Sequence, residues 1–346
     1  MIKKFFTLLT GLFLFGQVQS GFCATELDYM EYSTDALAQA AYVTDAGYSE
    51  TVNRQQTTAS GFGALGDVGD IEYREAQSFQ LSATLTVTAV ELRATSNNGA
   101  TGNWTFRIET DNSGEPSGTL ADANASIVVT PSTTGPVKGT FATPFSLTGS
   151  TIYWLVMQCD NQTTGLRWII GGDENGNPYS GGSRSQKANA IWTNFPNADL
   201  YFKVYVQGDP ILQSYSEATI KQQGSYSLKG IALVTDSLNK TLTRTVSPTI
   251  DLTEQTQIKF DIYSSRTGSN IKIGIRDSGL TTTETTPNIT SANTWQTITW
   301  DISGVSNADK DAIDRIIITS ANADADNTFY TDNMYTEAAR RIIFVQ

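Results

Sequence analysis

Ile258-Lys259-Phe260-Asp261-Ile262-Tyr263 is the stretch that decides the fold class. Its apolar and polar side chains alternate, which is the period-two pattern of a β-strand with one buried and one exposed face. The same alternation recurs at 103–110, 200–206 and 271–276, and turns rich in Gly, Asn, Asp and Pro separate these runs. The spacing of a βαβ unit is missing. The sequence therefore predicts an all-β protein with two antiparallel, jelly-roll-like β-sandwich domains.

Length and composition exclude several classes of protein. The 346 residues are enough for two domains that each bury their own core. The chain has no histidine, which excludes Ser-His-Asp hydrolases, Cys-His proteases and histidine-bound zinc. A glycosidase needs only two carboxylates, but no motif places two acids together in a cleft, so we expect a protein that is not an enzyme. The net charge of −12 disfavours nucleic acid and anionic lipid as partners.

The N-terminus has the layout of a secretory signal. Lys3 and Lys4 precede an apolar run over 5–15, and short or small residues follow up to Ser20. This order predicts a signal peptide over 1–20, cleaved on export to a secreted or cell-surface location. The apolar run is too short to cross a bilayer as a helix, and no other stretch is long enough, so we expect no transmembrane segment.

Two short helices are predicted between the strands. Thr34 can cap a helix over 35–42, where alanines and an early acid favour helix formation. Ser306 or Asn307 can cap a second helix over 308–313. Both are expected to be connectors.

Residues 75–207 resemble a known module of bacterial secreted proteins. The residues that carry the resemblance are Ala76-Gln77-Ser78-Phe79, the turn over 111–118, Tyr153-Trp154 and the closing Asp199-Leu200-Tyr201-Phe202-Lys203. They resemble the surface β-sandwich modules of the choice-of-anchor type. This resemblance implies a sandwich fold and says little about activity.

Residues 211–336 resemble a second family. The relevant stretches are Gly224-Ser225-Tyr226-Ser227-Leu228-Lys229, Trp295 to Ile302, Ile313-Asp314-Arg315-Ile316 and Phe329-Tyr330-Thr331-Asp332-Asn333. Their order is similar to that of the galactose-binding-like jelly rolls found among carbohydrate-binding modules. The resemblance implies a β-sandwich, and many relatives of this fold bind no sugar.

The domain boundaries follow from these two matches. The segment 26–48 is too short to bury a core, yet it contains apolar Leu37, Ala40, Ala41 and Tyr42, so it must dock on a domain. We predict that 26–48 joins 209–336 in one jelly roll, with the sandwich over 50–208 inserted between them. The alternative is a leader that extends the first sandwich. Residues 337–346 remain as a C-terminal tail.

The second resemblance also implies a metal site. In such jelly rolls a structural calcium joins an acid near the first strand to an aspartate near the last, and the matching residues here are Glu217 and Asp332. Calcium takes six to eight oxygens, so backbone carbonyls around Ser225 and water would have to complete the shell. The alternative is that Asp332 accepts backbone N–H bonds at a strand end while Glu217 is solvated.

A candidate ligand surface lies opposite the predicted core of the second domain. Lys259, Asp261 and Tyr263 share the outer face of their strand, and the next strand adds Lys272 and Arg276. Sugar binding needs aromatic faces beside planar polar groups, and these five residues together could line a shallow groove. The alternative is an ordinary solvated sheet face. Trp300 shares a face with apolar neighbours and is predicted to lie in the core. For Trp295 two alternatives stay open: an exposed position, or a structural position as in the resembling fold.

These observations favour a secreted, non-catalytic protein for carbohydrate binding or adhesion, with a glycan or cell-surface polymer as partner. The alternative is a structural surface or appendage component that assembles through sheet faces and edges. Four apolar residues follow Arg340 and Arg341 in the tail, so the tail is expected to attach to a sheet edge, its own or that of a protein partner.

Overall fold

The computed structural model describes residues 25–68, 71–131, 134–160, 166–174, 176, 178–234 and 236–338. Almost all of the regular structure is antiparallel β-sheet, which confirms the predicted all-β sandwich class. The predicted signal peptide and the tail from residue 340 onward lie outside the described residues. Within the described residues, every helix is too short or too polar to cross a membrane.

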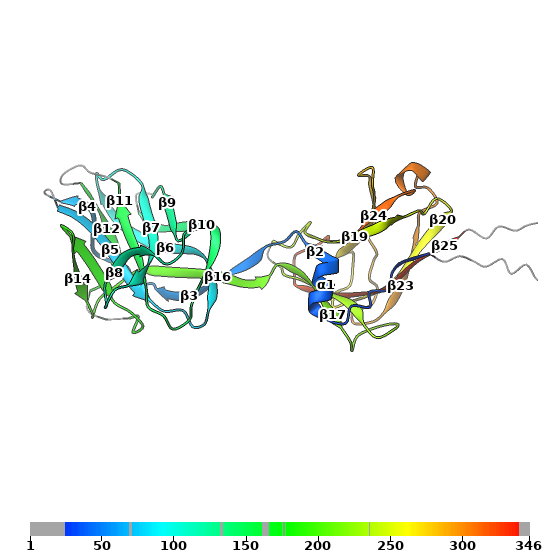
Figure 1. Cartoon of the computed structure of the whole chain (residues 1–346), viewed down its shortest axis with the longest axis horizontal. Helices are drawn as coiled ribbons and strands as arrows, with labels where there is room; N and C mark the ends of the chain where they lie inside the picture. Colours follow the sequence, from blue (N-terminus) through cyan, green and yellow to red (C-terminus); the bar gives the residue numbers. More distant parts are fainter. Residues whose placement is uncertain are drawn as a thin grey trace, which may run out of the picture. The chain divides into compact units, whose positions relative to one another are not determined.

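The described chain divides into two compact units. Residues 25–47 and 211–338 form the first, called here the split unit, and Tyr48–Pro210 form the second, called the central unit. The junctions lie close to the boundaries predicted from the sequence. Figure 1 shows the two ends of the split unit's chain, in blue and in yellow to red, within the same set of strands.

The split unit is a sandwich of two sheets. The first sheet has the strand order β17-β18-β25-β20-β23, with β1 also paired to β25. We call it the front sheet, and its strands are β1 (Glu26–Asp28), β17 (Leu212–Glu217), β18 (Ser227–Ala232), β20 (Gln255–Ser264), β23 (Gln296–Asp301) and β25 (Asn327–Ala338). The jelly roll was expected to end at residue 336, and β25 extends it to Ala338.

The second sheet, called the back sheet, has the order β2-β19-β24-β21-β22. Its strands are β2 (Tyr42–Thr44), β19 (Thr241–Ile250), β21 (Ile271–Asp277), β22 (Thr282–Thr285) and β24 (Ile313–Ser320). One core cluster lies between the sheets, because Phe260 of β20, Ile273 of β21 and Ile318 of β24 all belong to it and are almost fully buried. The predicted helix over 308–313 is instead a single turn of 3-10 helix, Asn307–Asp309, and β24 begins at Ile313.

The N-terminal segment completes the split unit. Helix α1 (Asp35–Ala41) begins at Thr34, whose side chain caps the Leu37 amide as predicted. The helix packs beside β17 (Figure 1). Of the four apolar residues expected to dock, Tyr42 is buried in the core and Ala41 packs against it, whereas Leu37 is 52% exposed and Ala40 is exposed. Ala38, four residues before Tyr42, lies in the core in place of Leu37.

The central unit consists of one continuous hydrogen-bonded sheet of 14 strands that closes around its own core. Val204 and Phe106 come from strands far apart in the strand order, yet both belong to this core. The buried thiol of Cys159 lies there too. The strands are β3 (Tyr48–Gln56), β4 (Ser60–Val68), β5 (Ile71–Phe79), β6 (Leu85–Asn98), β7 (Trp104–Asp111), β8 (Pro116–Leu120), β9 (Ser126–Val129), β10 (Gly135–Leu147), β11 (Tyr153–Cys159), β12 (Arg167–Asp173), β13 (Arg184–Ala188), β14 (Ile191–Phe195), β15 (Asp199–Leu200) and β16 (Phe202–Pro210).

Candidate functional site

Three aromatic rings form a row across the outer face of the front sheet. Tyr263 of β20 lies directly opposite Tyr330 of β25, and their ring centroids are 5.2 Å apart at 88°. On the other side, the Tyr263 ring lies 5.7 Å from that of Trp295, the residue just before β23. The first contact is edge-to-face and the second is tilted, and together they hold each ring in place through its neighbours. We call Tyr330, Tyr263 and Trp295 the aromatic row.

The row faces away from the core because of strand alternation. Ile258, Phe260 and Ile262 of β20 are fully buried in the core, so Tyr263 projects from the opposite face. Tyr263 and Trp295 are half-buried, and Tyr330 is 7% exposed. Trp300, by contrast, belongs to the core, which confirms its predicted assignment.

Polar side chains extend the row toward the edge of the sheet. Lys229 of β18 pairs with Tyr330, and Tyr215 of β17 pairs in turn with Lys229. The carboxylate of Glu217 interacts with the Lys229 ammonium and with Tyr330. Burial raises the pKa of Tyr330, and the negative charge of Glu217 raises it further. Aromatic, cationic and anionic groups therefore share one face.

The sequence-predicted residues on β20 have different environments. Tyr263 is the centre of the row. Lys259 is half-buried and lies opposite Tyr335 and Thr299 on the same outer face. Asp261 is only 3% exposed. Its Oδ1 accepts a hydrogen bond from Thr297 Oγ1 at 2.5 Å and its Oδ2 a longer one from Asn333 Nδ2 at 3.4 Å, so it supports the face rather than contacting solvent.

Lys272 and Arg276 do not join this face. They lie on β21, which belongs to the back sheet, whereas β20 belongs to the front sheet. Lys272 Nζ binds Glu284 at 2.8 Å and Arg276 binds Asp314 through two nitrogens at 2.8 and 3.1 Å. The expectation that consecutive strands would be neighbours fails here because the chain crosses from one sheet to the other between Ser264 and Ile271.

Asp332 lies next to the row, under the loop that joins β17 to β18. It is 1% exposed, and its Oδ2 accepts the backbone N–H groups of Gln222 and Gln223 at 2.8 and 2.9 Å. Its Oδ1 is buried and has no hydrogen-bond partner among the described residues. Burial raises the pKa of Asp332 despite these N–H bonds, and the charge of Asp261, its cross-strand neighbour, adds to the rise.

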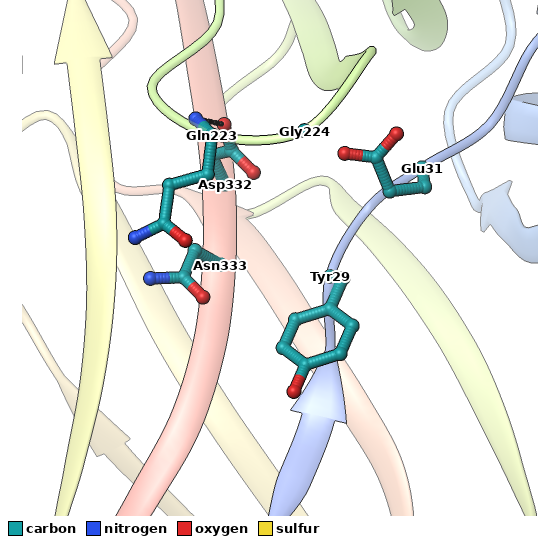
Figure 2. A pocket seen from close by; sticks show the side chains of 6 residues that line it. All are labelled: Tyr29, Glu31, Gln223, Gly224, Asp332 and Asn333. Atoms are coloured by element: carbon teal, nitrogen blue, oxygen red, sulfur yellow. Dashed lines mark hydrogen bonds between the residues drawn. The ribbon is translucent and has the colours of Figure 1, made fainter.

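A pocket of about 410 Å³ opens beside Asp332. It exists because β25 pairs with β18 only up to Thr331 and with β1 from Met334 onward, which leaves a gap at the bulged Asn333. Figure 2 shows the lining side chains: Tyr29 and Glu31 on one side, Gln223, Asp332 and Asn333 on the other, with Gly224 in the loop above. The Glu31 carboxylate accepts the Ser225 N–H at 2.9 Å.

The structure assigns different tasks to the two predicted calcium ligands. Glu217 Oε1 caps the turn that follows β17, accepting the N–H of Thr219 at 2.6 Å and of Ile220 at 3.3 Å. Although burial opposes the effect, these bonds and nearby Lys229 hold the pKa of Glu217 below its usual value. Asp332 retains a buried oxygen to which no described residue donates, which is an arrangement that a hard cation satisfies. Within the described ranges, no three or more Asp, Glu or Cys side chains are grouped to hold a metal ion.

Sequence reasoning named Tyr263 but missed Tyr330, Lys229 and Tyr215. The signal for Tyr330 was its alternation with the buried Phe329, which places it on an outer face. What the sequence lacked was the register that sets Tyr330 against Tyr263. The sequence alone does not decide whether Trp295 is exposed, and the structure places it in the row.

No protein-family model matches the chain, and no curated protein matches it in sequence. Solved structures give matches at low similarity, and they include several carbohydrate-binding modules with a β-sandwich fold. A family 30 carbohydrate-binding module of a Clostridium thermocellum cellulosomal cellulase has a TM-score of 0.32 and 18% identity, over 39% of this chain and 90% of that one.

Two further matches are similar in extent. A family 11 carbohydrate-binding module from Clostridium thermocellum, solved with a β-1,3-1,4-mixed-linked tetrasaccharide, has a TM-score of 0.28 and 19% identity over 38% of this chain and 91% of that one. An exo-β-agarase has a TM-score of 0.32 and 14% identity over 38% of this chain, and the match spans only 23% of the agarase.

Proposed function

We propose that the outer face of the front sheet binds a carbohydrate chain. The observation that carries the proposal is the aromatic row, Tyr330, Tyr263 and Trp295, held on an outer face beside Lys229 and Glu217. Tyr263 and Trp295 are half-buried and can contact a sugar, whereas Tyr330 is 7% exposed and holds Tyr263 in place. Lys229 and Tyr215 continue the same face over the next two strands, so the surface extends over four strand spacings, roughly 19 Å at about 4.8 Å each. That width suits a chain of sugars rather than a single one.

The chemistry of the row matches that of a glycan. The apolar face of a pyranose packs on aromatic rings, and its hydroxyl groups bond to charged and amide side chains at the edges. The rings are locked by their mutual contacts, so little conformational entropy is lost on binding. Such a rigid surface favours a ligand with flat apolar faces and a polar rim.

We further infer a secreted and non-catalytic role. The predicted signal peptide over 1–20 would direct export. Glu217 and Asp261, two of the carboxylates on this face, are engaged in hydrogen bonds that fix a turn and a strand contact. Neither is positioned as a free acid and base across a cleft, which supports binding without cleavage.

A glycan array with the mature chain tests the proposal. The expected result is saturable binding to one class of polysaccharide, lost in Tyr263→Ala and kept in Tyr48→Ala. Tyr48 is a suitable control because it is 49% exposed and lies in the central unit. If the array showed no binding, or if Tyr263→Ala bound as well as the parent, the structural-component alternative would replace this proposal.

We also propose that calcium binds at the pocket beside Asp332. The Asp332 Oδ1, unpartnered among the described residues, supports this, and Glu31 lines the same pocket. In this proposal Glu31 takes the place of Glu217 beside Asp332, because Glu217 caps a turn. Calcium would neutralise the buried charge there, with backbone and water oxygens completing its shell. The melting temperature of the parent chain should be higher with calcium than with a chelator. Equal melting curves under the two conditions would contradict the calcium site.

A further inference from the structure

A second pocket, of about 200 Å³, lies on the central unit. Several strand ends meet there: Ser78 in β5, Asp111 at the end of β7, Ile152 just before β11, Trp154 in β11 and Asn194 in β14. The loop before β13 closes one side. The pocket belongs to the other compact unit and shares no residue with the aromatic row.

Asp111 is the fixed polar group of this pocket. The Trp154 indole N–H donates to its Oδ1 at 2.7 Å, and the Gly114 N–H lies 3.2 Å from both carboxylate oxygens. Trp154 is 1% exposed, so the buried indole holds the carboxylate in one orientation. A carboxylate has about four acceptor positions, which leaves Oδ2 able to accept more hydrogen bonds.

Asn194 faces Asp111 from the opposite hairpin. Its side chain is exposed, its Oδ1 accepts the Ser183 hydroxyl at 3.0 Å, and its Nδ2 makes only a long 3.4 Å contact to the Gly114 carbonyl. The amide is therefore oriented by Ser183 while its N–H groups are weakly used. A ligand hydroxyl can replace the long contact at little cost.

The rest of the lining is two serines, glycine backbone and apolar surface. A Cβ added at Gly182 would lie 2.0 Å from the Ser78 carbonyl oxygen, so no side chain can stand at that position. Ile152 is 38% exposed at the rim and provides an apolar edge. The pocket thus combines a carboxylate, an amide, two serines, open backbone, the Trp154 ring and an apolar rim at Ile152.

We propose that this pocket binds a single neutral sugar ring. Asp111 and Asn194 would take adjacent hydroxyl groups, and Ile152 would contact the ring's C–H face. Among the described residues the lining has no cationic side chain, which argues against an anionic ligand, and a single carboxylate is too few for calcium. About 200 Å³ is below the size of pockets for drug-sized ligands.

An NMR titration of the full chain tests this proposal, with the tryptophan indole N–H signals as the readout. The probes are D-glucose, D-galactose, D-mannose and D-xylose, added separately. With at least one sugar, the Trp154 signal should shift and saturate. Asn194→Ala should weaken that binding about fivefold or more, as for loss of one hydrogen bond. Asp111→Asn should also weaken sugar binding, and the asparagine oxygen can still accept the Trp154 indole N–H.

The matched control is Asn124→Ala, an exposed asparagine in a turn of the same unit, which should bind like the parent. The Trp295 signal reports the aromatic row in the same experiment, so failure of one site is distinguishable from failure of the other. A Trp154 signal that never saturates with any of the four sugars, or equal binding by parent and Asn194→Ala, would overturn the assignment.

Discussion

Replacement of Asp332 by asparagine should stabilise the split unit at neutral pH in the absence of calcium. In the parent chain the ionised carboxylate has one buried oxygen to which no described residue donates, and it lies across from Asp261. A buried unsatisfied polar group costs about 1 to 3 kcal/mol. The asparagine side chain would keep an oxygen for the N–H groups of Gln222 and Gln223, and its neutral amide group costs less to bury than the ionised oxygen that it replaces. A gain of about 1 to 2 kcal/mol corresponds to a rise of roughly 2 to 8 °C in melting temperature for a unit of this size.

The pH dependence provides the sharper readout. Because burial raises the pKa of Asp332 above its unfolded value, the protonated group stabilises the fold. That stabilisation is fully present below the unfolded pKa, near 3.9, and is lost as pH rises through the folded pKa. Calorimetry in chelator between pH 3.5 and about 7.5 should therefore show the parent losing stability relative to Asp332→Asn. Curves that stay parallel across this range, or a less stable variant at pH 7, would refute the reasoning.

Three further predictions concern other parts of the chain. Gly230→Ala places a methyl group 2.1 Å from an aromatic carbon and should cost about 1 to 3 kcal/mol in urea unfolding, whereas Gly304→Ala meets nothing within 4 Å and should be nearly neutral. Arg184→Ala leaves the buried Glu75 carboxylate without its partner at 2.8 Å and should cost about 3 to 5 kcal/mol, and a loss below 1 kcal/mol would contradict the assigned role. Deletion of residues 340–346 should change self-association or thermal stability, and no change in sedimentation or melting would rule out tail attachment.

Strand alternation predicted much of the fold. The buried positions of β20 and the polar face opposite them follow directly from period two, and both are found in the structure. The sequence also indicates that the N-terminal segment packs on another part of the chain, because a segment this short cannot bury Tyr42 by itself. The phase of α1 was less accessible, since Leu37 and Ala38 are both apolar and only the position of β17 decides which one is buried.

The candidate site was predictable only within a single strand. Tyr263 and its outward direction could be read from the sequence. Its neighbours could not, because Tyr330 lies 67 positions further along the chain and reaches it through the β20–β25 register. Lys272 is near in sequence but belongs to the other sheet, so sequence distance was misleading in both directions. The register of a sheet depends on tertiary pairing, and one sequence does not specify it.

Binding of a glycan-array hit to Tyr263→Ala tests the central claim most directly. Loss of the middle ring removes its contact with a sugar, worth about 1.5 kcal/mol, so the dissociation constant should rise about tenfold in calorimetric titration. It also leaves Tyr330 and Trp295 without the ring that holds them in place. Tyr263→Phe keeps the ring and should bind within about threefold of the parent. An unchanged dissociation constant in Tyr263→Ala, in a chain that melts as a folded protein, would contradict carbohydrate binding by the aromatic row.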